Sequence, residues 1–180
     1  MIPAQYRDLL RPDLPRMLKA AVADYGVRET PGPGSTTAIM QWAHALGIRG
    51  YRSDDIPWCG LAVAHWAQEA GRPITEQPLW ALSWRHWGEP VTDSPALGDV
   101  LVWSRRGGGH VGMYVGHDKT HFHCLGGNQG DAVNIRRFPR GASSDLSFVA
   151  VRRPPYQQRP VTAMPVVRSR NGAPAGGPVT

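Results

Sequence analysis

The sequence predicts an α+β domain, with helices in its first half and a meander of short strands in its second. One observation is that apolar residues recur at helical spacing up to about residue 70. Another is that the period changes near Asp99, after which short apolar runs alternate with glycine-rich turns. The composition agrees, because 41% hydrophobic and 19% charged residues in a chain of 180 suit one globular domain.

Two helices are expected in the first 50 residues. Residues 14–25 carry apolar side chains at helical spacing, and Gly26 can cap the C-terminus of this helix. After a loop rich in proline and glycine, Ser35 or Thr36 can cap a second helix over residues 37–46. The 21 glycines and 17 prolines of the chain argue against longer uninterrupted helices.

The third helix has the clearest signals at its ends. Pro57 suits the first turn of a helix and Asp55 can cap it, while Gly71 stops it. Cys59 therefore falls at the N-terminus of this helix. A short amphipathic stretch with three tryptophans follows over residues 78–90.

The second half of the domain is expected to be a sheet. Five short strands are predicted, at residues 99–104, 110–116, 120–125, 132–135 and 146–151. Residues 1–153 then form one domain. Residues 154–180 are rich in Pro, Arg, Gln and Gly and have no strand or helix period, which predicts a flexible tail.

The positive charge of the chain is concentrated near its end. Residues 1–135 hold 12 Lys and Arg against 13 Asp and Glu, whereas residues 136–180 hold 8 Arg against Asp145 alone. Such a basic segment is attracted to polyanions, including nucleic acid and anionic cell-wall polymers, or simply keeps the protein soluble. A nucleic-acid-binding module is the weaker reading, because the chain has no recognition motif for nucleic acid.

Several other classes are excluded by simple counts. No apolar run approaches the roughly 20 residues that a membrane span needs. The charged N-terminus has no apolar stretch typical of a Sec signal peptide. Two cysteines are too few for a disulfide framework, and no CxxC pair indicates structural zinc.

Cys59 is the candidate nucleophile. At a helix N-terminus, unsatisfied backbone N–H groups and the positive end of the helix dipole favour a thiolate over a thiol. The same N–H groups could also help to hold an oxyanion. The alternative is that Cys59 is a small buried apolar residue, since free cysteines are often buried.

His110 is the candidate general base. It follows three glycines and opens a predicted strand, where it can meet a helix packed on the sheet. A cysteine at a helix start followed about fifty residues later by a histidine at a strand start is the order of a papain-like Cys–His arrangement. Asn128 could orient the imidazole as third member, and His123 is the alternative.

Five segments, taken in order, resemble a phage and prophage cysteine hydrolase family related to the NlpC/P60 and CHAP peptidoglycan amidohydrolases. They read GVRETPGPGST, DIPWCGLAV, GDVLVW, GGGHVGMYVG and LGGNQGDAVNI, and the resemblance covers roughly residues 14–153. It implies a papain-like fold, with N-terminal helices packed on a short antiparallel sheet. It further implies Cys59 as nucleophile, His110 as base and Asn128, or else His123, in the third place, with no cofactor.

The resemblance also implies a substrate, an amide bond in the peptide stem of the bacterial cell wall. On this reading Trp58, Glu29, Asp54, Asp55 and Gln129 line the substrate groove, and the carboxylates among them can bind an amine of the stem. The protein would work as a monomer on peptidoglycan, as a phage lysin or as a secreted antibacterial effector. An effector would have an immunity protein as its partner. Without a Sec signal, a holin, a phage particle or a secretion machine would deliver it.

Other chemistry remains open at this point. His121, His123 and Cys124 are close in sequence, but Cys124 would point away from the two histidines on a strand, so no metal site is expected. A disulfide between Cys59 and Cys124 would consume the nucleophile. Glu29 with Asp54 or Asp55 could serve a glycosidase. A non-catalytic module that binds the cell wall or nucleic acid through its basic end is the remaining alternative.

Overall fold

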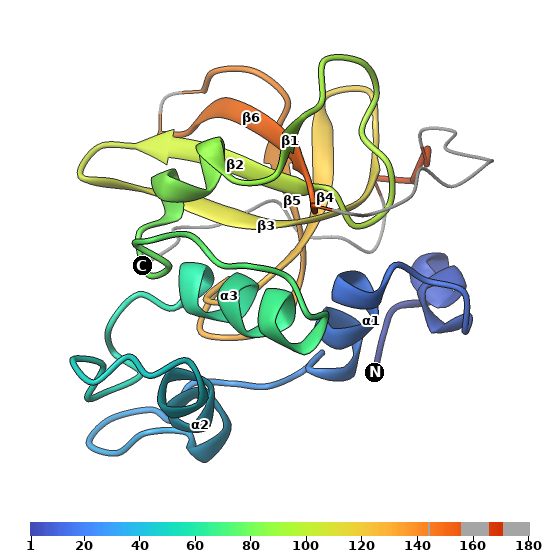
Figure 1. Ribbon diagram of the computed structural model, residues 1–180. Coiled ribbons are helices and arrows are strands. Elements are labelled where there is room, and N and C mark those ends of the chain that lie inside the picture. Colours follow the sequence, from blue (N-terminus) through green and yellow to red (C-terminus); the bar gives the residue numbers. More distant parts are fainter. Residues whose placement is uncertain (144, 156–165, 171–180) are drawn as a thin grey trace.

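Helices occupy the first half of the chain and strands the second, as the change of period predicts. The computed structural model describes residues 1–143, 145–155 and 166–170. A six-stranded antiparallel sheet forms one layer, and the α-helices lie on one side of it (Figure 1). The predicted α+β class is therefore confirmed.

The helical segments are short and lie close to their predicted places. They are the 3-10 helices η1 (Ala4–Leu10) and η2 (Ala81–His86) and the α-helices α1 (Arg16–Ala23), α2 (Thr37–Ala45) and α3 (Cys59–Glu69). The sequence did not indicate η1. The longest of them, α3, has 11 residues, and none of the described helices could span a bilayer.

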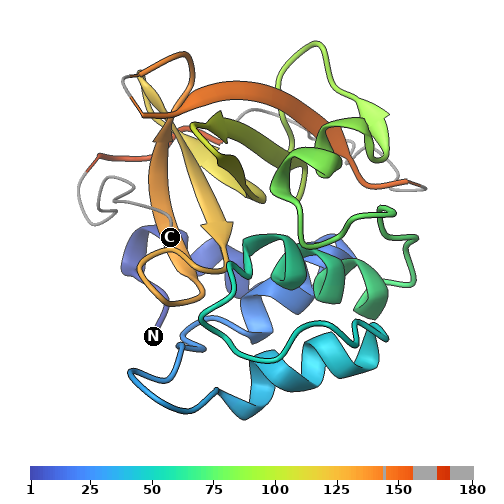
Figure 2. The ribbon, with the colours of Figure 1, turned by 90° about the vertical axis from the view of Figure 1, so that its left-hand side faces the viewer.

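The start of α3 differs from the prediction. The helix begins at Cys59, after Pro57, and its N-cap is Trp58, which makes no side-chain capping bond. Asp55 does not cap it and instead bonds Ser53. The helix is almost wholly buried, because it lies between the sheet and the other two α-helices. When the molecule is turned, the start of α3 comes to the front, between η2 above and α2 below (Figure 2).

The sheet is a meander closed by a strand from the end of the domain. Its strands are β1 (Glu89–Pro90), β2 (Val100–Arg105), β3 (Gly108–His117), β4 (His121–Gly126), β5 (Asn134–Pro139) and β6 (Ser147–Arg153). All neighbours are antiparallel, in the order β1-β6-β2-β3-β4-β5. The five predicted strands are present with shifted ends, and the short β1 was not expected.

Both faces of the sheet are covered. Along β2, Val100 and Val102 belong to the main core with the helices, whereas Leu101 and Trp103 belong to a second apolar cluster on the opposite face. This alternation follows from the two-residue period of a strand. Apolar side chains therefore pack against both faces of the sheet at β2.

Part of the predicted flexible tail is bound to the domain. Arg168 donates to the carbonyl oxygens of Val115 and Gln5 and forms a bidentate ion pair with Asp8. The adjacent Val167 makes a parallel bridge with the end of β3. Residues 166–170 are thus an ordered extension of the fold, while 156–165 and 171–180 lie outside the described residues.

Candidate active site

Cys59 is the first residue of α3, and its sulfur lies among backbone N–H groups. The amides of Val111, of Gly60 and of Cys59 itself face the sulfur. The first amides of a helix have no partner within the helix, so those of Cys59 and Gly60 are able to point there. Only 5% of Cys59 is exposed, so a substrate has to reach into the protein to meet the thiol.

His110 lies near the start of β3, where it pairs with Trp103 of β2. Its ring is fully buried and stacks on Phe138, with ring centroids 4.7 Å apart. The next residue, Val111, directs its N–H at the sulfur of Cys59. The sulfur of Cys59 therefore lies close to the backbone N–H of Val111, the residue that follows His110.

Gln129 holds one side of the imidazole. Its Oε1 lies 3.0 Å from Nε2 of His110, and its Nε2 donates to the carbonyl oxygens of Asn134 (2.6 Å) and Cys124 (3.3 Å). Carbonyl oxygens only accept hydrogen bonds, so these two contacts fix which end of the side-chain amide faces the imidazole. Oε1 must then accept, and Nε2 of His110 carries the proton.

The other ring nitrogen of His110 is therefore the basic one. In a neutral imidazole with the proton on Nε2, Nδ1 has the lone pair. Nδ1 is buried and has no hydrogen-bond partner among the described residues, the Cys59 sulfur included. Contacts between catalytic groups often tighten only once substrate binds. A neutral imidazole with an unused lone pair can act as a general base once substrate brings it and the thiol together.

The third position differs from the sequence-based assignment. Asn128 was expected on the ring, yet Gln129 occupies that place. Asn128 has a φ of 53°, in the left-handed region, so the chain turns there instead of continuing as a strand. Gly127 packs so tightly on Trp58 that a Cβ would lie 2.7 Å from the indole ring. This close approach fixes the loop and decides which side chain meets His110.

His123, the alternative third member, is engaged elsewhere. Its Nδ1 lies 2.6 Å from the hydroxyl of Tyr6, and its Nε2 lies 3.1 Å from a carboxylate oxygen of Asp118. The same carboxylate pairs with Arg137. Both ring nitrogens of His123 are thus occupied in a buried polar cluster, so His123 is wrong as a partner of His110.

Glu29 contacts Trp58, the residue that precedes Cys59. The indole N–H of Trp58 donates to a carboxylate oxygen of Glu29 at 3.0 Å. Burial, reinforced by the nearby carboxylates of Asp131, Asp54 and Asp55, raises the pKa of Glu29, although the Trp58 bond opposes this. The carboxylate of Glu29 therefore contacts the side chain of Trp58, the residue before Cys59. An amine of a substrate could meet this carboxylate there.

Asp54 has a structural task. One of its carboxylate oxygens accepts the backbone N–H groups of Thr30 (3.1 Å) and Thr36 (2.7 Å), which anchors the loop of prolines and glycines. Burial alone would raise the pKa of Asp54, but these bonds outweigh it and the net pKa is lowered.

Of the residues predicted to bind substrate, Asp54 is thus buried and holds a loop, and Asp55 stays exposed. Trp58 and Gln129 are fully buried, Gln129 against His110, so the prediction that they line a substrate groove is wrong.

Arg105 is a neighbour of the site that the sequence analysis missed. It ends β2, pairs with Gly108, and acts electrostatically on both Cys59 and His110. Its Nε is buried without a hydrogen-bond partner among the described residues. The only signal in the sequence was an arginine pair before the glycines that precede His110.

The thiol and the imidazole are both uncharged at rest. Burial raises the pKa of Cys59, and the surrounding amides and Arg105 do not reverse this. The expectation that the helix start alone would favour a thiolate is therefore not met. Burial also lowers the pKa of His110 to about 4, against the opposing effect of the Gln129 bond and with a further lowering by Arg105.

This pKa predicts where activity is lost in acid. The base must be unprotonated, so kcat/KM should stay high as the pH falls through 6.5 and drop only near pH 4. In Gln129→Glu, a carboxylate faces the ring and stabilises the imidazolium, so the acid limb should move to higher pH. The measurement is a pH profile of kcat/KM for both proteins.

Asn128→Asp is the matched control for that profile. It adds the same charge one residue away, at a position that does not bond the ring, and aspartate tolerates the left-handed backbone there. Its acid limb should move less than that of Gln129→Glu. If the acid limb of Asn128→Asp moves as far as that of Gln129→Glu, or farther, then Asn128 and not Gln129 is the third member.

The metal and disulfide alternatives gain no support. Within the described ranges, no group of three or more His, Cys, Asp and Glu residues has an arrangement that could hold a metal ion. His121 bonds Thr120, and His123 bonds Tyr6 and Asp118. Cys59 and Cys124 are both free thiols.

Comparisons with known proteins add no further information. No protein-family model matches the chain, and no curated protein matches it either. A functional assignment therefore rests on the residues of the site and their geometry.

Proposed function

We propose that this protein is a cysteine hydrolase of the papain-like type that cleaves an amide bond in the peptide stem of bacterial peptidoglycan. One observation carries the proposal: the Cys59 sulfur lies close to the backbone N–H of Val111, the residue that follows His110, while Gln129 fixes the tautomer that leaves Nδ1 of His110 basic. The motif resemblance to NlpC/P60 and CHAP amidohydrolases supports the substrate. The proposed triad is Cys59, His110 and Gln129.

The reaction would start from the neutral pair. Nδ1 of His110 takes the thiol proton as the sulfur attacks the carbonyl carbon of the amide. Backbone N–H groups at the start of α3 then stabilise negative charge developing next to them. His110 returns the proton to the leaving amine, which departs and leaves a thioester. Water, deprotonated by His110, attacks the thioester, releases the carboxylate product and restores the thiol.

Gln129 would orient the base without charging it. An aspartate or glutamate in the third place stabilises the imidazolium, whereas an uncharged amide oxygen only accepts a hydrogen bond from Nε2–H. The pKa of His110 accordingly stays low. The enzyme would therefore hold an uncharged pair until substrate arrives, and separate charge only during the attack.

The surroundings of Cys59 would suit a zwitterionic peptide. Glu29 and the exposed Asp55 provide negative charge on the side of Trp58, and Arg105 provides positive charge near His110. Peptide stems carry both amines and carboxylates, so each sign of charge would find a partner. Arg168, by contrast, is paired with Asp8, so this part of the basic segment is already neutralised.

Two settings fit a hydrolase of this kind: a phage lysin and a secreted antibacterial effector. Either would act on the wall after delivery by a holin, a phage particle or a secretion machine. Only an effector would need an immunity protein, which would have to keep substrate away from Cys59. We expect the catalytic unit to work as a monomer, because the proposed triad comes from a single chain.

The function is tested on purified sacculi. Mass spectrometry of the soluble fragments should show new amine and carboxylate ends within or at the base of the peptide stem. It would also identify the bond that is cut. Release of fragments with new reducing sugar ends and intact stems would refute the proposal, and would favour a glycosidase using Glu29 with Asp54 or Asp55.

A further inference from the structure

A cavity of about 670 Å³ opens between η2 and the chain that leads into it. Its wall comes from two segments, Pro73–Gln77 and Trp80–Gly88, with Pro155 at the edge. Its size falls in the range of sites that bind small molecules. Neither the proposed triad nor the acidic residues near Trp58 line it, so it is separate from the site described above.

The cavity wall is rigidly built. The hydroxyls of Thr75 and Ser83 lie 2.9 Å apart, and Ser83 also donates to the carbonyl oxygen of Gln77 at 2.8 Å. The indole of Trp87 donates to the carbonyl oxygen of Pro73 at 2.8 Å. These bonds tie the entering segment to η2, so the cavity is preformed.

The cavity adjoins the nucleophile. The carbonyl oxygens of Pro78 and Leu79 approach Gly60, the residue after Cys59, so closely that a Cβ there would lie 2.3 and 2.8 Å from them. Leu82 makes a similarly tight contact with Gly109, the residue before His110. The short stretch from Pro78 to Leu82 thus lies between the cavity and the residues next to Cys59 and His110.

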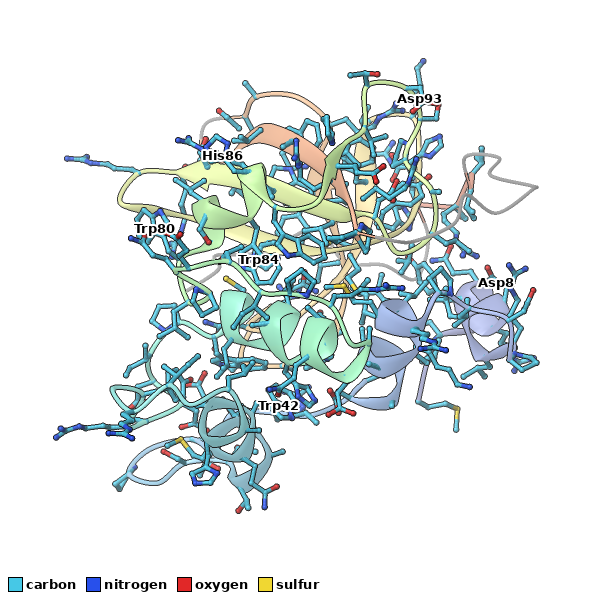
Figure 3. The ribbon with its side chains drawn as sticks, viewed as in Figure 1. Asp8, Trp42, Trp80, Trp84, His86 and Asp93 are labelled. Atoms are coloured by element: carbon cyan, nitrogen blue, oxygen red, sulfur yellow. The ribbon has the colours of Figure 1, made fainter. Side chains whose placement is uncertain are left out.

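Trp80 stands at the centre of this stretch and faces solvent. It is 47% exposed, and among the described residues no other Phe, Tyr or Trp side chain is exposed. Figure 3 shows Trp80 at the edge of the molecule near the start of α3, whereas Trp84 lies between η2 and α3. A single exposed apolar side chain is common on protein surfaces, but Trp80 also lines the cavity, so its indole is available to a ligand bound there.

We propose that this cavity binds a saccharide, with Trp80 as the platform on which a sugar ring stacks. The inference rests on the proposed function, and it places the glycan strand of the wall next to Cys59 while the attached peptide enters the site. The bound strand would position the peptide stem for attack. Trp80 would be a substrate-binding residue and not a catalytic one.

The chemistry of the wall selects this class of ligand. Glu76 and Arg85 bring one charge of each sign, so the wall favours neither an anion nor a cation. Gln77, Arg85 and His86 add donors and acceptors around an apolar indole. A sugar ring has apolar C–H faces and hydroxyls at its edge, and so matches both features. A purely apolar ligand would leave the polar side chains unpaired.

The test is direct binding of a β-1,4-linked tetramer of N-acetylglucosamine to the full chain. This probe has no peptide stem, so the proposed reaction cannot consume it. Calorimetry or tryptophan fluorescence should detect saturable binding to the wild type. Trp80→Ala should lower the affinity by about tenfold, and Trp80→Phe should keep most of it, because the phenyl ring still stacks.

Leu10→Ala is the control, since Leu10 is also an exposed apolar residue but lies on η1. It should bind the tetramer like the wild type, and circular dichroism should show that all variants are folded. Absence of saturable binding to the wild type would overturn the proposal. So would equal affinity in Trp80→Ala, or displacement of the tetramer by a peptide stem without sugar.

The two proposals fail in different ways. If sacculi are cut at an amide bond but the tetramer does not bind, the saccharide site is wrong and the hydrolase assignment stands. If the tetramer binds through Trp80 and no amide bond is cut, the saccharide site stands and the hydrolase assignment is wrong.

Discussion

Replacing Cys59 with alanine is expected to abolish the release of peptide fragments from sacculi, with a loss in kcat/KM of at least about a thousandfold. In the proposed mechanism only Cys59 forms the acyl intermediate, because His110 would transfer a proton and Gln129 would orient His110. The fold should persist, since the substitution removes one buried sulfur atom from the start of α3, and the hydrogen-bonding groups around that sulfur are backbone amides. The measurement is fragment release by mass spectrometry, at matched concentrations of folded protein.

Cys59→Ser provides a second variant with nearly the same shape. A hydroxyl is a much weaker acid than a thiol, so His110, whose pKa is about 4, cannot activate it well. Its activity should fall nearly as far as that of the alanine variant, while its thermal midpoint stays close to that of the wild type. Undiminished hydrolysis by either variant would exclude Cys59 as the nucleophile.

Replacing Asp118 with asparagine is expected to lower the free energy of unfolding by about 3–5 kcal/mol. The carboxylate is buried, pairs with Arg137 and accepts hydrogen bonds from His123 and Thr120. These donors hold the pKa of Asp118 far below its usual range, in spite of burial, which opposes them. Asparagine has the same shape but no charge, so the buried guanidinium would be left uncompensated. Urea denaturation measures the change.

Asp13→Asn is the control for this measurement. Asp13 pairs with Arg11 at 3.0 Å, but its side chain is largely exposed, so the loss should stay within about 0.5 kcal/mol. The effect of pH has a definite sign. Because the folded pKa of Asp118 is lowered, its contribution is present at neutral pH and is lost as the pH falls below the ordinary carboxyl range. A loss in Asp118→Asn no larger than in Asp13→Asn would contradict this account.

Local signals predicted the elements that carry the proposed chemistry. Proline before Cys59 and glycine after Glu69 bracketed α3, and the period of two after Asp99 indicated the strands. The helix-end residues and the strand period both depend on residues close in sequence, so both signals can be recognised in the sequence alone. The location of Cys59 at a helix start and of His110 at a strand start followed from them.

Long-range contacts decided what the sequence could not indicate. Gln129 reaches His110 because Gly127 lies against Trp58. Gly127 and Trp58 are nearly seventy positions apart, and no local sequence pattern reveals a contact over that separation. Asp54 was predicted near substrate, yet it binds amides of a loop that precedes it by about twenty residues. Arg168 pairs with Asp8 from the far end of the chain, in a segment with no helix or strand period.

The uncharged state of Cys59 has a consequence for the chemical stability of the proposed nucleophile. Oxidants and alkylating agents attack the thiolate form of cysteine, so a protonated, shielded sulfur reacts slowly with both. Peroxide met during release or transit would then leave the nucleophile intact. A hydrolase of the proposed type would therefore reach its substrate with its nucleophile intact. The thiol would become reactive only when a peptide is bound and His110 takes the thiol proton.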